Sequence, residues 1–372
     1  MRNVLIYRHQ LFTPSETFIA CQAGALRRFR PVYAGRLTLG EPPLGSRVAT
    51  LQGTSRVTIA RQALLRDPRP LHARTRGYGP ALIHAHFGVE GLYALGLAKR
   101  LKVPLVTTFH GFDATTTRLA LLRSRKASWI HYALFGRRLI RHGDLFVCVS
   151  DYIRERVLAA GFPQRRVVRH YIGIDTDVVR PSATLPTRKT IIHVARLVEK
   201  KGTRYLIQAF ARLAGRDIDA ELVIIGDGPL LPELRSFTAA LGLNARVHFL
   251  GVMPHATVLE WLGRAALLAL PSVTARSGDS EGLGMVLLEA AARAVPVVGT
   301  RHGGIPEAVR EGETGYLVPE RDVEALAERL AHLLANDGLR QAMGQAARRL
   351  VEEKFNLQRQ TDALEDLYES LL

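Results

Sequence analysis

The stretch "ALLALPSVTARSGDSEGLGMVLLEA", residues 266–290, joins two apolar runs through a polar loop that contains glycine. The first run is continuous rather than alternating, which is typical of a strand buried on both faces of a parallel sheet. It ends at Pro271 and Ser272, and the second run predicts a helix that starts near Gly284. The loop therefore leaves the carboxyl end of a parallel strand, where open α/β sheets bind their ligands.

Two glutamates stand eight residues apart in this stretch, Glu281 before the predicted helix and Glu289 inside it. At about 100° per residue their side chains point about 80° apart, so they do not form a paired dyad. The first amides of the helix would point at a phosphate, which the carboxylates would repel. We therefore expect the glutamates to accept hydrogen bonds from hydroxyls on either side of a nucleotide diphosphate sugar. On pattern alone, a helix N-terminal charge and one half-buried Glu fit equally well.

Similar apolar runs recur along the chain and alternate with helical patterns, such as 205–213 and 322–334. The predicted strands cover 3–7, 81–86, 104–109, 144–150, 190–196, 221–226, 247–251, 266–272 and 295–300. This alternation predicts doubly wound, Rossmann-like α/β sheets, and 372 residues suit two of them. Segment 173–189 is typical of a linker. The predicted domains are 1–184 and 185–355, with a C-terminal helix at 356–372 that packs back on the first domain.

Other strand ends also carry polar or small residues. Arg196 and Lys201 flank the end of the strand 190–196, where both cations could neutralise a diphosphate, although a solvated basic turn is the plainer interpretation. His110 ends the strand 104–109 and could contact a substrate; the alternative is a purely structural histidine. The residues expected to line a cleft between the domains are Pro14, Ser15, Glu16, Gly88, Gly111, Asp113, Gly226 and Gly228.

Positive charge is concentrated in the first half of the chain. Of the net +17, residues 1–186 carry +19, from 29 Lys and Arg against 10 Asp and Glu, and the remainder carries 22 against 24. Segment 115–141 has basic and apolar residues but no acid, as in helices that bind anionic membrane surfaces; a packed helix with a solvated basic face is the alternative. The candidate membrane-facing residues are Arg118, Arg123, Arg125, Lys126, Trp129, Arg137 and Arg138.

Cysteine and metal chemistry are not indicated. The two cysteines, Cys21 and Cys148, form no disulfide framework. Asp175 and Asp177 match a D-x-D pattern but lie in the linker, and no His or Cys cluster has metal-ligand spacing. No apolar run reaches the roughly 20 residues of a membrane span. We expect a cytoplasmic protein that needs neither metal nor other cofactor.

Eleven motifs, in order, resemble the retaining glycosyltransferases of family four, which have the two-domain GT-B fold. "SEGLGMVLLEA" is similar to that family's E-x7-E motif, and its C-terminal blocks are matched by "VARLVEKKG", "GDGP", "VHFLGVMP", "RHGGIPEAV" and "ETGYLVP". Its N-terminal blocks are matched by "SETFI", "HAHFG", "TFHGFD", "VSDYIRERV" and "IGID". The resemblance covers essentially the whole chain and is strongest to the subgroup that builds exopolysaccharide and lipopolysaccharide chains.

The resemblance implies two Rossmann-like domains that face each other across a cleft, and a role for each candidate residue. Glu281 would contact hydroxyls of the donor sugar and His110 would support the reacting centre, so these two are the predicted catalytic residues. Glu289 would bind the ribose hydroxyls. The diphosphate would be held by Arg196, Lys201, Gly282, Leu283, Gly284 and Met285, and the base by Phe249, Leu250 and Gly251. The family transfers with retention and usually without a metal.

The sequence thus predicts a hexosyltransferase that moves sugar from a nucleotide diphosphate sugar to a lipid-linked or polysaccharide acceptor, peripheral to the inner face of the cytoplasmic membrane. One alternative is a nucleotide-sugar epimerase of the same fold. A nucleic-acid-binding protein is another, but the basic half lacks a recognisable helix–turn–helix or RNA-binding block, so we expect no nucleic acid partner. A glycosidase fits poorly, because its two carboxylates must flank one bond about 5–10 Å apart.

Overall fold

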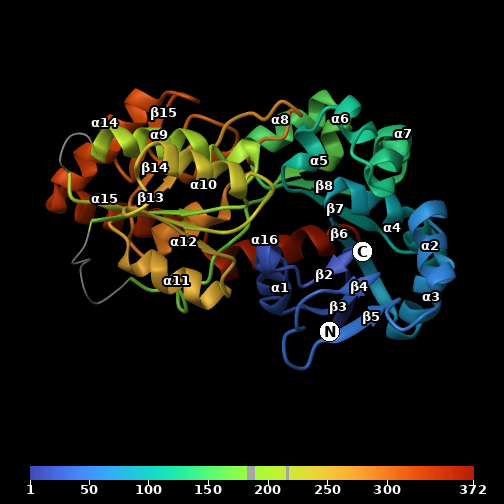
Figure 1. The fold of residues 1–372 in the computed structure, drawn as a ribbon. Helices are drawn as coiled ribbons and strands as arrows, with labels where there is room; N and C mark the ends of the chain where they lie inside the picture. The colour runs from blue at the N-terminus through green and yellow to red at the C-terminus, as the bar shows by residue number, and fades with distance from the viewer. Residues whose placement is uncertain (182–188, 215–217) are drawn as a thin grey trace. The chain divides into compact units, whose positions relative to one another are not determined.

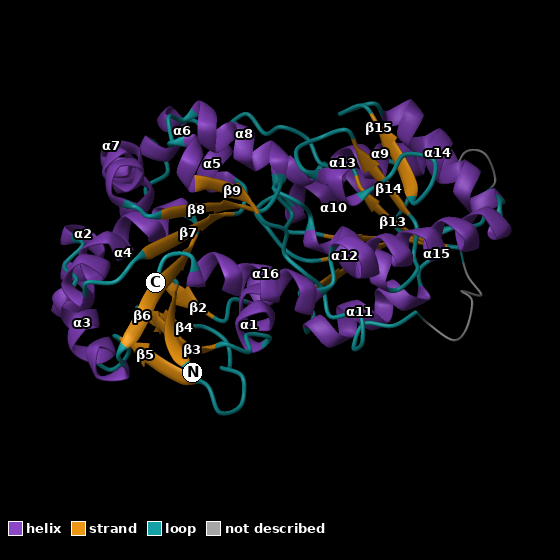
Figure 2. Cartoon of the chain, turned by 180° about the vertical axis from the view of Figure 1, so that it is seen from behind, coloured by secondary structure: helices purple, strands orange, loops and turns teal. Residues whose placement is uncertain are grey.

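The computed structural model describes residues 1–181, 189–214 and 218–372. The chain divides into two compact units, here called unit 1 (Met1–Gly173 with Leu357–Leu372) and unit 2 (Ile174–Asn356). Each unit has its own parallel sheet with helices on both faces (Figures 1 and 2). The predicted domain boundary at 184/185 falls within 182–188, outside the described residues. Unit 2 begins earlier, where the Ile174 N–H donates to the carbonyl of Phe355 at 2.8 Å.

Unit 1 contains a seven-stranded sheet with the order β5-β3-β1-β6-β7-β8-β9 and a separate two-stranded pair, β2-β4. All of its strand pairs are parallel. The strands are β1 (Arg2–Tyr7), β2 (Gln10–Leu11), β3 (Phe29–Gly35), β4 (Leu37–Thr38), β5 (Arg47–Thr50), β6 (Pro80–His86), β7 (Leu105–Phe109), β8 (Leu145–Cys148) and β9 (Val167–Arg169). The four strands predicted in this half are confirmed as β1, β6, β7 and β8.

Helices cover both faces of this sheet because its central strands are apolar on both sides. They are α1 (Thr17–Gly24), α2 (Arg56–Leu65), α3 (Arg69–Thr75), α4 (Gly88–Leu101), α5 (Phe112–Thr115), α6 (Arg118–Leu122), α7 (Ala127–His142), α8 (Asp151–Ala159) and α16 (Leu357–Glu369), with a 3₁₀ turn η1 (Pro14–Glu16) before α1. One core cluster joins β1 and β6 to α1 and α16. On the other face, α4 packs against β6, β7 and α7.

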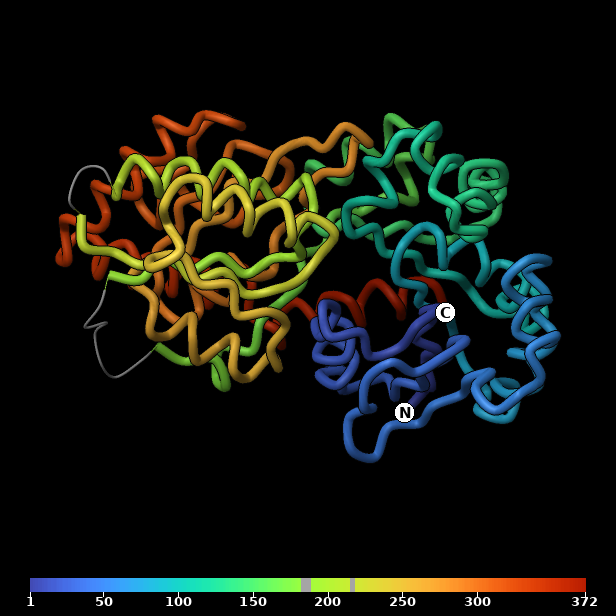
Figure 3. Tube along the Cα trace, viewed as in Figure 1, coloured from blue at the N-terminus to red at the C-terminus, as the bar shows by residue number. Residues whose placement is uncertain are grey.

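The C-terminal helix α16 belongs to unit 1 although it follows all of unit 2 in the sequence, and the end of the chain runs beside the N-terminal elements (Figure 3). Leu364 and Tyr368 are buried in the core of unit 1. Glu365, fully buried, accepts hydrogen bonds from the backbone N–H groups of Arg27, Arg28 and Phe29 at 2.7–3.0 Å. The carboxylate therefore satisfies three amides at the start of β3 and holds the helix there.

Unit 2 has a six-stranded, fully parallel sheet with the order β12-β11-β10-β13-β14-β15. The strands are β10 (Thr190–Val194), β11 (Glu221–Ile225), β12 (Val247–Gly251), β13 (Leu267–Leu270), β14 (Val297–Thr300) and β15 (Gly315–Val318). All five strands predicted here are confirmed, and β15 is additional. The helices are α9 (Thr203–Ala214), α10 (Leu231–Ala240), α11 (His255–Arg264), α12 (Met285–Ala292), α13 (Ile305–Ala308), α14 (Val323–Ala335) and α15 (Asp337–Lys354), with a 3₁₀ turn η4 (Glu199–Lys201) before α9.

Both sheets reverse their direction of growth between two central strands. In unit 1 this switch point lies between β1 and β6, and in unit 2 it lies between β10 and β13. The loops that follow these strands leave in opposite directions and open a space at the carboxyl edge, where doubly wound sheets bind ligands. The predicted α/β architecture is confirmed, and in unit 2 the loop quoted above follows one of the two switch-point strands.

Candidate active site

The strongest candidate site lies at the switch point of unit 2. The turn η4 after β10 carries Lys201, and the loop after β13 carries Glu281. Lys201 Nζ is 2.5 Å from Glu281 Oε2, and the Ser272 hydroxyl lies 3.5 Å from the same oxygen. The helix predicted near Gly284 is confirmed as α12, which begins at Met285. Two predicted site residues 80 positions apart in sequence are therefore in direct contact.

The electrostatics of this pair keep Glu281 ionised. Burial alone would raise its pKa, but the ammonium groups of Lys201 and Lys200 outweigh burial and lower the pKa to about 2. A carboxylate in this state accepts hydrogen bonds and donates none. It is suited to bind sugar hydroxyls and unsuited to serve as a general acid.

Lys200 is a site residue that the sequence analysis missed. Its Nζ donates to Asp279 Oδ1 at 2.9 Å and to the carbonyl oxygen of Ser280 at 3.3 Å. Burial opposes its charge, but Glu281 and Asp279 raise its pKa above the usual value. The two adjacent lysines thus anchor two acids of one loop, and the doublet in "VEKKG" was the available signal.

Gly284 directly precedes the N-terminus of α12. Gly284 has φ +83, a left-handed conformation that favours glycine. As in any α-helix, the first N–H groups of α12 have no partner within the helix and give its N-terminus a partial positive charge. Glu289 lies inside the helix, and its Oε1 is 2.9 Å from His255 Nε2 on α11. The hydrogen bond to Glu289 raises the pKa of His255, and this effect outweighs that of burial, which lowers it. A ribose at Glu289 would share the carboxylate with this histidine.

The remaining predicted residues of unit 2 surround this site. Arg196 is exposed just after β10. Gly226 and Gly228 do allow a close approach, but of the protein's own backbone: a Cβ at these positions would lie 2.0 Å from the carbonyl oxygen of Ala195 and 2.4 Å from that of Leu197. Their smallness therefore serves loop packing and is explained without a ligand. Phe249, Leu250 and Gly251, the predicted base region, are half-buried at the end of β12.

In unit 1, His110 follows β7 and is enclosed by aromatic rings. The ring centroids of Phe87 and Phe18 lie 4.5 Å and 5.1 Å from that of His110. Its Nε2 is 3.1 Å from His86 Nδ1, while its Nδ1 is buried and has no hydrogen-bond partner among the described residues. Burial, with a contribution from Arg8, holds the pKa of His110 well below its usual value. The ring is therefore a neutral imidazole whose buried Nδ1 is unsatisfied by the described residues.

Asp113, predicted to line the cleft, is instead buried beneath this histidine. Its Oδ1 accepts from the backbone N–H groups of His110 and Gly111 at 3.1 and 3.0 Å, and its Oδ2 accepts from that of Gly88 at 2.7 Å. Burial raises its pKa to about 6, against the effect of these donors. Gly88 is equally enclosed, since a Cβ there would lie 2.5 Å from the Tyr132 hydroxyl. These residues fix the loops around His110, and their burial is explained by contacts within unit 1; the prediction that they line a cleft stays a prediction.

A buried charge cluster lies beside His110 at the same edge of the sheet. Arg8 follows β1, and its guanidinium binds Glu16 at 2.5 Å and also contacts Glu90 on α4. The same guanidinium lies 4.2 Å from the ring centroid of Phe87. Burial raises the pKa of Glu90 to about 7, with Arg8 opposing. Among the predicted loop residues 14–16, Glu16 thus has a clear partner, whereas Pro14 and Ser15 are exposed.

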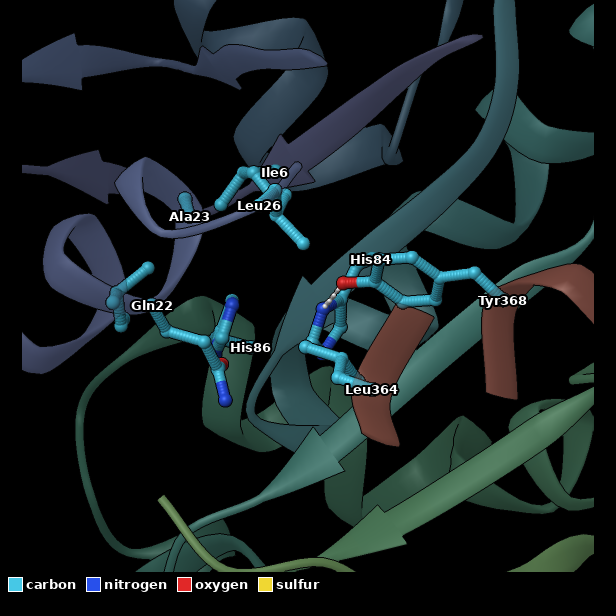
Figure 4. Close-up of a pocket in the computed structure, with 9 residues that line it drawn as sticks. Ile6, Gln22, Ala23, Leu26, His84, His86, Leu364 and Tyr368 are labelled. Atoms are coloured by element: carbon cyan, nitrogen blue, oxygen red, sulfur yellow. Dashed lines mark hydrogen bonds between the residues drawn. The ribbon is translucent and has the colours of Figure 1, made fainter. Parts of the chain in front are cut away.

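A narrow pocket lies under α16 in unit 1 (Figure 4). It is lined by Ile6, Ile19, Gln22, Ala23, Leu26, His84, His86, Leu364 and Tyr368. Both nitrogens of His84 are engaged, Nδ1 with the Tyr368 hydroxyl at 2.5 Å and Nε2 with the Thr108 hydroxyl at 2.6 Å. Burial lowers the pKa of His84 to about 3. His84 is therefore a structural histidine that joins the sheet to the C-terminal helix.

The basic segment after His110 forms α6 and α7. Arg118, Arg123, Arg125, Lys126, Arg137 and Arg138 are all exposed. Leu119, Leu122 and Leu134 are 55%, 36% and 50% exposed on the same two helices. Trp129 is half-buried, stacked on Phe112 at 4.8 Å between ring centroids. Within the described ranges, the chain has no helix that is both long and apolar enough to cross a membrane.

The D-x-D pattern forms a local turn. Asp175 Oδ1 accepts from the N–H groups of Asp177 and Val178, each at 3.0 Å. In the part of the chain that the structure covers, no three His, Cys, Asp or Glu side chains are grouped as a metal site.

Known families match both halves of the chain. The family model described as glycosyl transferases group 1 matches residues 175–350, and that described as glycosyltransferase family 4 matches residues 34–178. WcaL of Escherichia coli strain K12, a glycosyltransferase provisionally assigned to colanic acid biosynthesis, is 36% identical over 74% of this chain and 66% of its own length. The amylovoran biosynthesis glycosyltransferase AmsK of Erwinia amylovora is 32% identical over 80% of this chain and 72% of its own.

Solved structures share the fold over the entire chain. HepE of Anabaena, in complex with UDP and glucose, has a TM-score of 0.80 at 20% identity and full coverage of both chains. Sucrose-phosphate synthase of Thermosynechococcus elongatus has the same TM-score and identity, covering 100% of this chain and 99% of its own. The fold is GT-B, as predicted. With the sequence relatives, these findings show that the chain belongs to glycosyltransferase family 4 and is a glycosyltransferase.

Proposed function

We propose that this glycosyltransferase moves a hexose, with retention and without a metal, from a nucleotide diphosphate sugar to a lipid-linked or polysaccharide acceptor in cell-surface glycan synthesis. The observation that carries the proposal is the contact between Lys201 and Glu281 beside the N-terminus of α12. The proposed donor agrees with HepE, which has been solved with UDP-glucose. The proposed acceptor class agrees with the names of AmsK and WcaL.

The site in unit 2 offers separate partners for the leaving group and the sugar. The first N–H groups of α12, with Lys201 and Arg196, would stabilise the charge that develops on the departing diphosphate. Glu281 would accept hydrogen bonds from the sugar, because its low pKa keeps it ionised. The Lys201 ammonium has three N–H donors, so it can bridge the Glu281 carboxylate and a phosphate oxygen.

His110 would complete the reaction centre as a neutral hydrogen-bonding group. Its pKa is held well below the usual value, so it carries no charge near neutral pH. A neutral ring can contact a sugar hydroxyl without attracting the diphosphate. The buried Nδ1, which no described residue bonds, is the atom that the substrate would satisfy.

A donor panel tests the proposal. Each of UDP, GDP, ADP and their common sugars is added and the melting temperature is followed; a donor at 100 times its dissociation constant should add about 2.7 kcal/mol of stability. The stabilising nucleotide sugar is then incubated with and without lipid-linked oligosaccharide. Release of nucleoside diphosphate that depends on the acceptor supports transfer, whereas conversion of the sugar without acceptor indicates an epimerase.

Glu281→Gln assigns the role of the carboxylate within that assay. Nucleoside diphosphate binding should be nearly unchanged, while transfer should fall on the order of 10²–10³-fold, as for other lost transition-state contacts. Glu233→Gln on α10, an exposed glutamate, is the matched control. An equal loss of diphosphate binding and transfer in Glu281→Gln would contradict the proposed role.

The exposed face of α6 and α7 is proposed to dock on an anionic membrane. Basic side chains and three leucines are exposed on these helices and the turn between them, a combination typical of interfacial helices. Lys126 Nζ lies 4.6 Å from the ring centroid of Trp129. An anionic surface attracts each nearby Lys or Arg by about 1 kcal/mol, so three or four contacts would bring the enzyme to a lipid-linked acceptor.

Vesicle co-sedimentation tests this docking. We expect binding to vesicles that contain anionic lipid, weak binding to neutral vesicles, and release as salt rises. Replacing Arg123, Arg125 and Lys126 by Ser should weaken binding and leave donor binding intact. Replacing Lys99, Arg100 and Lys102 by Ser, at the end of α4, removes the same charge elsewhere in unit 1 and should have a smaller effect. If the wild-type protein does not bind anionic vesicles at low salt, the proposal of membrane docking is wrong.

A further inference from the structure

His302, which follows β14, contacts the backbone of Glu281. It is 3% exposed, its Nε2 accepts a hydrogen bond from the Glu281 N–H at 3.1 Å, and its Nδ1 lies 2.7 Å from Glu320 Oε1. A backbone N–H can only donate, so Nε2 must be unprotonated and the ring proton must lie on Nδ1, which donates to Glu320. The two contacts together specify one neutral tautomer of His302.

The two residues that follow His302 contact the carbonyl group of Glu281. The carbonyl oxygen of Glu281 accepts from the Gly304 N–H at 3.1 Å. Gly303 has φ +56, and a Cβ there would lie 2.2 Å from that carbonyl oxygen. The backbone of Glu281 is therefore bonded through both its N–H and its C=O by residues 302–304, while Lys201 holds its side chain.

Glu320, which binds His302, also binds the first part of the loop between β13 and α12. It accepts from the Thr274 N–H at 2.8 Å and from the Thr274 hydroxyl at 3.2 Å. Thr274 lies shortly after β13, in the loop that carries Glu281 and leads to α12. The loop is thus tied near one end by Glu320 and at the other by His302, which are themselves bonded to each other.

We propose that His302 is a positioning residue for sugar transfer, and that its Nδ1-protonated tautomer, specified by Glu320, fixes the backbone of Glu281 and hence the direction of the carboxylate. This inference rests on the proposed role of Glu281 at the donor sugar. The charged groups around the relay are Glu320, Glu281, Arg321, Lys201 and Lys200. Loss of the contact between His302 and the Glu281 N–H should therefore loosen the loop and lower the rate of transfer.

Two amide substitutions separate the two contacts of His302. In His302→Gln, the side-chain oxygen reaches the position of Nε2 and can accept from the Glu281 N–H. In His302→Asn, the shorter side chain reaches only the position of Nδ1, so it can contact Glu320 but leaves the Glu281 N–H buried without an acceptor. The donor is the nucleotide sugar that gives the largest thermal shift in the panel, and the rate is its slow hydrolysis to nucleoside diphosphate.

We expect kcat to fall on the order of 10²-fold in His302→Asn, because a misplaced reactive group costs about that much. The fall in His302→Gln should be less than about tenfold, as for one lost hydrogen bond. KM for the donor should change little in either variant. Equal rates in the two variants would overturn the proposal.

Hydrogen exchange gives a readout that needs no activity. The peptide 273–284 should exchange faster in His302→Asn and at the wild-type rate in His302→Gln. If His302→Asn does not fold, Glu320→Leu, at a residue with a 25% exposed side chain, replaces it. Glu320→Leu removes the acceptor that specifies the tautomer, while Glu320→Gln keeps an oxygen there. Wild-type exchange and hydrolysis in Glu320→Leu would contradict the relay.

Glu281→Gln, measured in parallel, separates this inference from the proposed function. If Glu281→Gln hydrolyses the donor at the wild-type rate, the proposed role of Glu281 is wrong. If Glu281→Gln is impaired but the His302 variants behave alike, only the positioning role of His302 is wrong.

Discussion

Replacing Lys201 by Met is expected to destabilise unit 2 by about 2–3 kcal/mol. Its partner Glu281 is buried, and the neighbouring cations lower the Glu281 pKa from the ordinary 4.5 to about 2. At about 1.4 kcal/mol per pH unit, that difference corresponds to about 3.5 kcal/mol of interaction. Lys201 contributes more of it than Lys200 does. Removing one partner of a buried ion pair usually costs about 3–5 kcal/mol of stability. Because Lys200 still compensates part of the Glu281 charge in Lys201→Met, we expect a loss at or below the lower end of that range.

The pH dependence of this effect has a definite sign. Because the pKa of Glu281 is lowered by folding, its contribution is fully present above about pH 4.5 and is lost as the pH falls toward about 2. Without Lys201 the folded pKa rises, so the variant protonates Glu281 at a higher pH and removes the unpaired charge. The difference in unfolding free energy between wild type and Lys201→Met should therefore be constant near neutrality and shrink in acid.

Urea unfolding followed by tryptophan fluorescence measures this difference. The chain has two tryptophans, so a Trp129→Phe background leaves Trp261, on α11, to report unit 2 alone. The control is Arg204→Met, whose pair with Glu233 is 2.8 Å long but 47% and 57% exposed, and which should cost less than about 1 kcal/mol. Adding Glu281→Gln to Lys201→Met should restore most of the loss. A Lys201→Met variant no weaker than Arg204→Met, or no recovery in the double variant, would refute the reasoning.

Three further predictions concern the ligand and the C-terminal helix. Arg196→Ala should weaken nucleoside diphosphate binding by about 1.5–3 kcal/mol in calorimetry and leave nucleoside binding unchanged; equal losses for both ligands would indicate a folding defect instead. EDTA should leave transfer intact, and a strict requirement for Mn²⁺ or Mg²⁺ in the same assay would contradict the metal-free proposal. Glu365→Ala should lower the stability of unit 1 by at least about 1–3 kcal/mol in urea, because the buried Phe29 N–H and two partly buried N–H groups lose their acceptor; a change below about 1 kcal/mol would show that water replaces it.

The sequence pattern predicted the strands that are buried on both faces and missed most of the others. Continuous apolar runs mark β6, β10 and β13, because both faces of a central parallel strand pack against helices. β3 carries Arg30 and Pro31 within "FRPVYAG", and β5 is the edge strand beside it. Strands near an edge keep one side open to solvent, so their sequences need not be apolar, and the pattern misses most of them. The edge strand β12 was predicted because "VHFLG" still carries three apolar residues.

The rule that ligands bind at strand ends predicted part of the site. It placed Lys201 and Glu281 after the ends of two different strands, and the structure shows the two side chains in contact at the switch point. Applied to β14, the same rule would have drawn attention to His302. It could not tell whether Asp113 faces a ligand or binds the amides of its own loop. Either is possible for an acid that follows a strand, and backbone geometry decides between them. The partner of Glu289, His255, comes from another helix, which a local pattern does not reveal.

The charges of the candidate site are nearly balanced before any ligand binds. Arg196, Lys200 and Lys201 contribute +3, and Asp279 and Glu281 contribute −2, so the net charge is only +1. Both lysines already bind an acid, while Arg196 is exposed. The attraction of a diphosphate to this site must therefore come mainly from Arg196 and the amides at the N-terminus of α12. Substitution of Arg196 should then act chiefly on donor affinity, and substitution of Lys201 chiefly on the orientation of Glu281 and the rate of transfer.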